Sequence, residues 1–61
     1  MIIEIKETMV GKHVVTTKEH SSLALTFPQG TRVKVIGVDD IRGYDIENDE
    51  GDVISEIGRV I

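Results

Sequence analysis

Short apolar runs, separated by single glycine or proline residues, make up most of this chain. Threonine and the β-branched aliphatic residues are frequent within the runs, and apolar and polar positions tend to alternate. Alternation is typical of β-strands, in which successive side chains point to opposite faces of a sheet. No long segment keeps the apolar spacing of an amphipathic helix. The pattern therefore predicts an all-β fold.

The alternation places strands along the whole chain. They are predicted at Ile2–Glu7, Lys12–Lys18, Leu23–Phe27, Thr31–Val38, Tyr44–Glu47, Val53–Ile57 and Arg59–Ile61. Large apolar side chains that share a phase within one strand are expected to face the core together. The predicted inward set contains Ile3, Ile5, Leu23, Leu25, Phe27, Tyr44 and Ile46. A change of phase beside Gly37 predicts a β-bulge in the strand that contains it.

Turn-forming residues separate these strands. The segments Glu19–Ser22 and Asp39–Gly43 are polar and are predicted to be loops. The segment Phe27–Gly30 has proline at the second position of a predicted β-turn and glycine at the fourth. Asn48–Gly51 is predicted to close a hairpin, in which Gly51 is available for a positive φ.

The order of these segments resembles the SH3-like barrel family between Val14 and Ile61. The segment Leu25–Ile36 is similar to that family's apolar pair, turn and long strand, and Asn48–Asp52 resembles its distal hairpin. The resemblance implies a small five-stranded barrel forming a single domain over residues 1–61. Met1–Lys12 would be an extra N-terminal strand or arm.

The proline-peptide binding of SH3 domains is not implied by this resemblance. Those domains hold proline-rich peptides on a platform of several aromatic side chains. This chain has one tyrosine and one phenylalanine, and Phe27 is predicted to lie in the core. Only Tyr44 occupies a matching position, where the family usually has tryptophan. The ligand of such a barrel is therefore open.

The length of 61 residues limits what the chain can do. A domain of this size buries only about 60% of the surface that its unfolded chain exposes, which leaves little structure for a reaction pocket. The chain has no cysteine, so disulfides and thiolate zinc sites are excluded and a reducing cytoplasm fits best. Its start lacks the long apolar run of a signal peptide or membrane span. We expect a cytoplasmic protein that is not an enzyme and needs no cofactor.

Charge is distributed unevenly along the chain. Residues 1–38 hold five lysine or arginine residues and three acids, a net charge of +2. Residues 39–61 hold eight acids and two arginines, a net charge of −6, and the two parts sum to the overall −4. This balance disfavours nucleic acid as the general partner, although it allows a basic partner to meet the acidic half.

Three polar groupings look like chemical sites but lack a requirement of the chemistry. The run Asp45–Asp52 is rich in oxygen ligands, yet its glycine comes one position too late for a calcium loop. His13 and His20 are too few ligands for zinc and are predicted at the surface. The run His20–Ser22 lacks a third group to orient the histidine towards a serine nucleophile. The sequence therefore predicts no catalytic and no metal-ligating residue.

The candidate binding residues lie in and beside the predicted acidic loop. They are Asp39, Asp40, Arg42 and Tyr44. Tyrosine and arginine are enriched at binding hot spots, and arginine can bind a carboxylate through two parallel hydrogen bonds. The sequence therefore predicts a non-catalytic interaction module that binds another protein or a second copy of itself. Association with nucleic acid through the basic half, and inhibition of a basic surface by the acidic half, remain open alternatives.

Overall fold

The computed structural model of this protein describes residues 2–39 and 41–61, which form short strands and one turn of 3-10 helix. The elements in chain order are the 3-10 helix η1 (Glu7–Met9) and the strands β1 (His13–Val15), β2 (His20–Ser22), β3 (Leu25–Phe27), β4 (Arg32–Asp39), β5 (Gly43–Asn48) and β6 (Val53–Ile57). The prediction of an all-β fold is confirmed.

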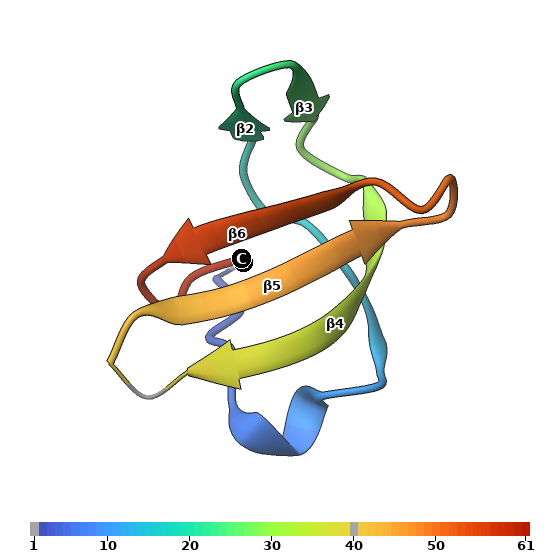
Figure 1. Ribbon diagram of the computed structural model, residues 1–61. Coiled ribbons are helices and arrows are strands. Elements are labelled where there is room, and N and C mark those ends of the chain that lie inside the picture. The colour runs from blue at the N-terminus through green and yellow to red at the C-terminus, as the bar shows by residue number, and fades with distance from the viewer. Residues whose placement is uncertain (1, 40) are drawn as a thin grey trace.

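The strands form two separate antiparallel sheets. The larger sheet has the order β1-β4-β5-β6, and β2 pairs only with β3. Figure 1 shows β4, β5 and β6 as a meander, with the β2–β3 hairpin standing above β6. No strand pairing among the described residues joins the two sheets into a closed barrel, so the five-stranded SH3-like barrel is not confirmed.

The core lies on one face of the larger sheet. Its buried members are Ile5, Phe27, Val33, Val35, Tyr44, Ile46, Ile54 and Ile61. They come from alternate positions of β4 and β5, from the end of β3, from one position of β6 and from both ends of the chain. Alternation along each strand brings these side chains to the same face, so the predicted inward direction of Tyr44 and Ile46 is confirmed.

A β-bulge in β4 returns the apolar side chains of the second half of the strand to the core face. The register between β4 and β5 shifts between Val35 and Gly37, as the change of phase predicts. Val35 is fully buried before the bulge, and Val38 packs against the core after it. The extra residue, Ile36, is turned towards solvent. One strand thereby supplies apolar side chains in two phases to the same core.

The predicted N-terminal strand Ile2–Glu7 is mostly absent. Glu4 forms a single bridge with Val60, and the chain then enters η1. The expected burial is nevertheless present, because Ile5 is buried and Ile3 packs against the core. Backbone hydrogen bonds hold this segment to the C-terminal residues. The C-terminal residues were predicted to pair with an early strand, and the observed pairing is limited to these hydrogen bonds and the bridge.

The prediction for the segment before β3 is wrong. Glu19–Ser22 was predicted to be a turn, but its last three residues form β2, and the reversal follows at Leu23 and Ala24. Leu23 was predicted to point inward and is instead fully exposed, with a φ of 30°. A two-residue hairpin loop requires positive φ, so the strand pairing dictates this conformation although leucine does not favour it.

Candidate binding surface

The face of the larger sheet that points away from the core carries a hollow of about 530 Å³. We call this face the outer face. Cross-strand neighbours Gly37, Asp45 and Ser55 line the hollow together with Asp39 and Ile57 from the next row. The hollow therefore lies where β4, β5 and β6 run side by side, next to the loop that joins β4 to β5.

The structure brings together three of the residues that the sequence singles out. Asp39, Arg42 and Tyr44 all contribute to the lining of the hollow. Asp40 lies outside the described residues. The predicted loop and the first residues of β5 are thus the rim of a surface depression, and the residues around it make the candidate binding surface.

Asp39 shapes the rim of the hollow. Its Oδ1 accepts hydrogen bonds from the backbone N–H groups of Ile41, at 2.8 Å, and Arg42, at 3.1 Å. These two hydrogen bonds lower the pKa of the Asp39 carboxyl, because they favour its charged form. The carboxylate therefore holds the backbone at Ile41 and Arg42, and with it the position from which the exposed Arg42 side chain extends.

Two glycines make room for the floor of the hollow. A Cβ atom on Gly37 would lie 3.2 Å from Oδ2 of Asp45, so the missing side chain leaves space for this carboxylate. Gly43 has a φ of 148°, and a Cβ atom there would lie only 2.0 Å from the carbonyl oxygen of Glu56. The start of β5 can approach β6 this closely only because residue 43 has no side chain.

Tyr44 has a structural role in this surface. Its side chain is 3% exposed, and its hydroxyl donates a hydrogen bond to the carbonyl oxygen of Val60. Burial, with a smaller contribution from the Glu56 carboxylate, raises the pKa of the Tyr44 hydroxyl. The sequence predicts an inward ring and also names Tyr44 as a candidate binding residue; the ring lies in the core, where its hydroxyl holds the C-terminal segment, and a role in binding stays a prediction.

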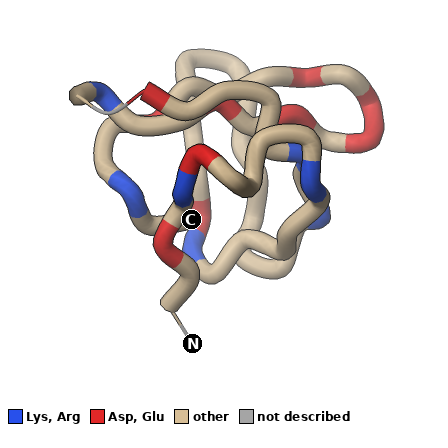
Figure 2. Tube along the Cα trace, turned by 90° about the horizontal axis from the view of Figure 1, so that it is seen from below, with Lys and Arg blue, Asp and Glu red and all other residues tan. Residues whose placement is uncertain are grey.

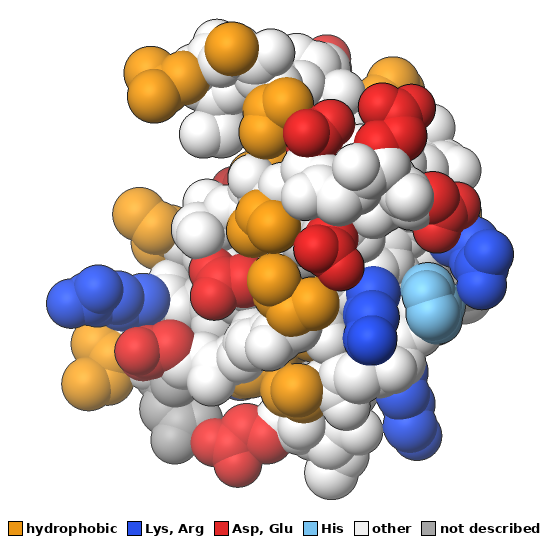
Figure 3. Space-filling model, turned by 45° about the vertical axis from the view of Figure 1, so that its right-hand side comes forward, with side chains coloured by type: hydrophobic (Ala, Val, Ile, Leu, Met, Phe, Trp, Pro, Cys, Tyr) orange, Lys and Arg blue, Asp and Glu red, His pale blue; other side chains and the backbone are white. Residues whose placement is uncertain are grey.

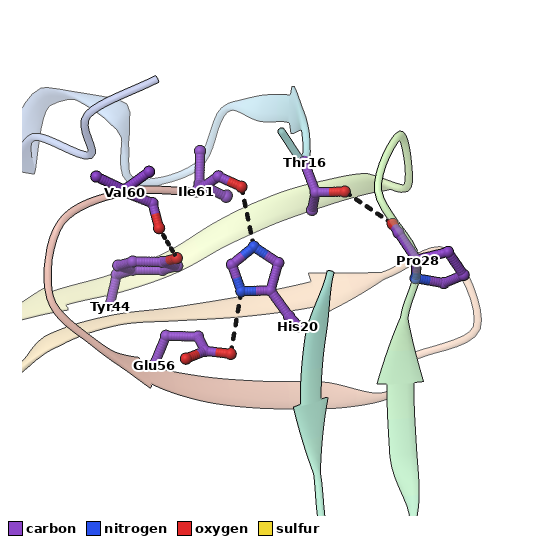
Figure 4. A network of polar contacts seen from close by, with 7 residues as sticks. All are labelled: Thr16, His20, Pro28, Tyr44, Glu56, Val60 and Ile61. Carbon is purple, nitrogen blue, oxygen red and sulfur yellow. Dashed lines mark hydrogen bonds and ion pairs between the residues drawn. The ribbon is translucent and has the colours of Figure 1, made fainter. Parts of the chain in front are cut away.

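His20 is the main polar residue that the sequence analysis misplaced. It was predicted at the surface and is 1% exposed. Figure 4 shows its ring between two oxygen acceptors: Nδ1 lies 3.0 Å from Oε1 of Glu56, and Nε2 lies 2.9 Å from the carbonyl oxygen of Ile61. His20 therefore ties the β2–β3 hairpin to β6 and to the end of the chain.

The pairing within the hairpin was the signal that could have located His20. A two-residue turn at Leu23 and Ala24 places His20 directly opposite Phe27. Phe27 was already predicted to lie in the core, and directly opposite residues of an antiparallel pair point to the same side. Recognising the short turn would thus have predicted a buried histidine.

Exposed apolar side chains lie beside the hollow. Ile57, which lines it, is 88% exposed, and Ile41 in the adjoining loop is 94% exposed. The space-filling view in Figure 3 shows hydrophobic side chains among charged ones, and an empty space between the upper part of the molecule and its body. The outer face is thus partly apolar, although it is the solvated side of the sheet.

Acidic and basic residues lie close together at one end of the larger sheet. Figure 2 shows acidic positions gathered in the loop between β5 and β6, where Asp49, Glu50 and Asp52 lie. Lys34 is opposite Glu47 in the register of β4 and β5 and opposite His13 in that of β1 and β4. The hollow lies at the other end of the β5–β6 hairpin, where Gly43 pairs with Ile57.

The described residues contain no group of three or more histidine, cysteine, aspartate or glutamate side chains placed to hold a metal ion. None of the helical segments in the described part of the chain is long and apolar enough to cross a membrane.

Comparison of the chain with protein-family models, curated proteins and solved structures finds no match. The function is therefore argued from the residues and their geometry.

Proposed function

We propose that this protein is a non-catalytic interaction module that binds a protein partner through its outer face around the hollow. The observation that carries the proposal is the exposure of Ile57 and Ile41 beside Arg42, on the rim of a depression in that face. Apolar side chains next to an exposed arginine are the combination that gives binding energy at protein interfaces.

The local structure supports binding more than catalysis. A general base needs a ring nitrogen or a carboxylate oxygen within reach of a substrate. Both ring nitrogens of His20 contact protein oxygens inside the molecule, and the Oδ1 atom of Asp39 is occupied by backbone N–H groups. His20 and this oxygen of Asp39 therefore serve the fold.

Two expectations from the sequence belong to this proposal. The SH3-like architecture is supported by the long bulged strand β4 and by the β5–β6 hairpin, which lie where the resemblance places them. A cytoplasmic location is supported by a composition without cysteine.

Two exposed arginines allow a matched test of the binding surface. Arg42 lines the hollow, and Arg32 lies on β4 in register with β1. We expect affinity purification from native lysate to recover a protein partner with the wild type and with Arg32→Ala, but not with Arg42→Ala. Recovery of the same partner with Arg42→Ala would contradict the proposal, provided that circular dichroism shows both variants to be folded.

Nucleic-acid binding is a second candidate, favoured by the position of the basic residues. His13, Arg32 and Lys34 lie together on β1 and β4 and are exposed, although Glu47 is opposite Lys34 in the register of β4 and β5. Phosphate contacts require such a basic surface and weaken with added salt. In this case nucleic acid would be recovered with Arg42→Ala and lost with Arg32→Ala, which is the reverse of the first expectation.

A further inference from the structure

Strand β6 has an open side. It is the last strand of the larger sheet and pairs only with β5. Backbone hydrogen bonds run from Asn48 to Asp52 and from Gly58 to Arg42, which identifies the even-numbered residues of β6 as the hydrogen-bonded positions towards β5. Hydrogen-bonded and non-hydrogen-bonded pairs alternate in an antiparallel ladder. The N–H and C=O groups of Val53, Ser55 and Ile57 therefore point to the open side.

The side chains of these three residues leave the open side unprotected. Val53, Ser55 and Ile57 are exposed on the outer face, and none of them is charged. The neighbouring Glu56 points to the other face, where it contacts His20. Soluble proteins usually protect an edge strand with charges, proline or short length. Strand β6 has five residues, no proline and no charge among these three, and the β2–β3 hairpin contacts it without strand pairing.

The opposite edge of the sheet is protected. Strand β1 has only three residues, and Lys12 and Lys18 flank it in the sequence. His13 lies on β1 opposite Lys34, so basic side chains surround this edge. Short length and lysines oppose the addition of another strand. The β1 edge is therefore better protected against strand pairing than the β6 edge.

We propose that the open side of β6 pairs with β6 of a second copy of this chain, antiparallel and centred on Ser55. This inference goes beyond the proposed function, because it concerns the edge of β6 and not the outer face around the hollow. In this register Ser55 faces Ser55 of the other copy, and Val53 faces Ile57. All three outward-facing residues then take part in the ladder, and the two exposed apolar side chains become cross-strand neighbours.

Charge complementarity supports this occupant and this direction. The acidic residues Asp49, Glu50 and Asp52 precede β6, whereas Arg59 follows it and Arg42 lies beside its end. An antiparallel copy brings the start of one β6 to the end of the other. Opposite charges therefore meet at both ends of the contact, which a parallel arrangement would not achieve.

The contact is a single strand edge, so we expect a weak dimer with a dissociation constant on the order of 100 µM. Analytical ultracentrifugation of the full chain across this range tests it. Ile57→Asp places a carboxylate opposite the partner's Val53 and should raise the dissociation constant by about two orders of magnitude. Val15→Asp makes the same change on the other edge strand, at a side chain that is 52% exposed, and should leave dimerisation unchanged.

A second variant tests the backbone pairing itself. Ser55→Pro removes an N–H group that points to the open side and leaves the hydrogen bonds to β5 in place. It should abolish dimerisation while circular dichroism still shows a folded β protein. If this variant does not fold, Ile57→Asp alone decides.

The outcomes separate this inference from the proposed function. A wild type that is monomeric at about ten times the expected dissociation constant would overturn the β6 pairing, as would a dimer that persists in Ile57→Asp or is lost in Val15→Asp. In each of these cases, recovery of another protein that depends on Arg42 would still support the proposed function. A dimer that depends on Ile57 supports the inference whether or not another protein is recovered.

Discussion

Leu23 combines two features that are unfavourable for an isolated monomer. Its backbone has a positive φ, and its side chain is fully exposed at the tip of the β2–β3 hairpin. A left-handed conformation costs an L-residue about 1–2 kcal/mol, and glycine is free of this cost. The exposed side chain gains no packing within the chain that would offset it.

We therefore expect Leu23→Gly to stabilise the protein by about 1 kcal/mol, in spite of the flexibility that glycine adds to the unfolded chain. Urea unfolding followed by circular dichroism measures this change. Ala24→Gly, at the neighbouring turn position where no positive φ is recorded, is the control and should not stabilise. A loss of stability in Leu23→Gly would show that the leucine side chain packs within the folded chain.

Tyr44 makes the stability depend on alkaline pH. Because burial raises the pKa of its hydroxyl above the ordinary value of 10.0, the folded state favours the neutral phenol. The resulting stabilisation is present in full below pH 10.0 and is lost as the pH rises through the raised pKa. Tyr44 is the only tyrosine and the chain has no tryptophan, so phenolate absorbance reports this one group.

We expect this absorbance to appear together with unfolding and not before it. Tyr44→Phe removes the hydroxyl that binds Val60 and should cost about 1 kcal/mol at neutral pH, while the loss of stability at alkaline pH becomes smaller. Titration of the wild-type phenol near pH 10 in the folded state would contradict the buried position.

At the level of elements, the β2–β3 hairpin is held by the buried Phe27 and by the polar contacts of His20. It is a separate two-stranded sheet, and a two-stranded hairpin alone is marginally stable in water. His20 supplies its polar connections to Glu56 and Ile61. Each ring nitrogen lies within hydrogen-bond distance of one of these oxygen atoms.

Replacement of His20 tests this connection. His20→Leu keeps an apolar side chain of similar size but leaves two acceptors without a donor, and should destabilise the protein by about 2–4 kcal/mol. Glu56→Gln keeps an oxygen acceptor for Nδ1 and should cost less than His20→Leu. Urea unfolding of the two variants gives the comparison, and an equal stability of His20→Leu and the wild type would refute the role assigned to the ring.

Gly43 holds β5 close to β6, and a matched pair of glycines tests how much depends on it. Gly43→Ala creates a backbone clash with Glu56 and should cost more than about 3 kcal/mol. Gly37→Ala meets only the Asp45 carboxylate, at 3.2 Å, and should cost less. Thermal unfolding distinguishes the two, and similar midpoints would contradict the close approach at residue 43.

The sequence predicts elements well where alternation is long and less well where it is short. The eight residues of β4 and the β5–β6 hairpin carry enough pattern to locate strands, the bulge and the positive φ of Gly51. Strands β2 and β3 have three residues each, so a shift of the turn reverses which side chains face inward. The errors at His20 and Leu23 both follow from that turn.

The structure shows where the candidate binding residues lie, and their role in binding stays a prediction. Asp39 and Arg42 lie on the rim of the hollow as the loop composition suggests, because polar residues between two paired strands must lie at one end of the sheet. The edge of β6 could not be found from sequence, since the order of strands decides which strand has an open side. That order is a property of the whole fold.

At the scale of the whole molecule, the open side of β6 decides whether two copies of the chain can pair. Amide hydrogen exchange measured by NMR at several protein concentrations tests it residue by residue. We expect the amides of Ile54 and Glu56, which face β5, to be protected at every concentration, and those of Val53, Ser55 and Ile57 to gain protection as the concentration rises. Protection of the Ser55 amide that is already complete in dilute solution, or that never changes with concentration, would contradict the account.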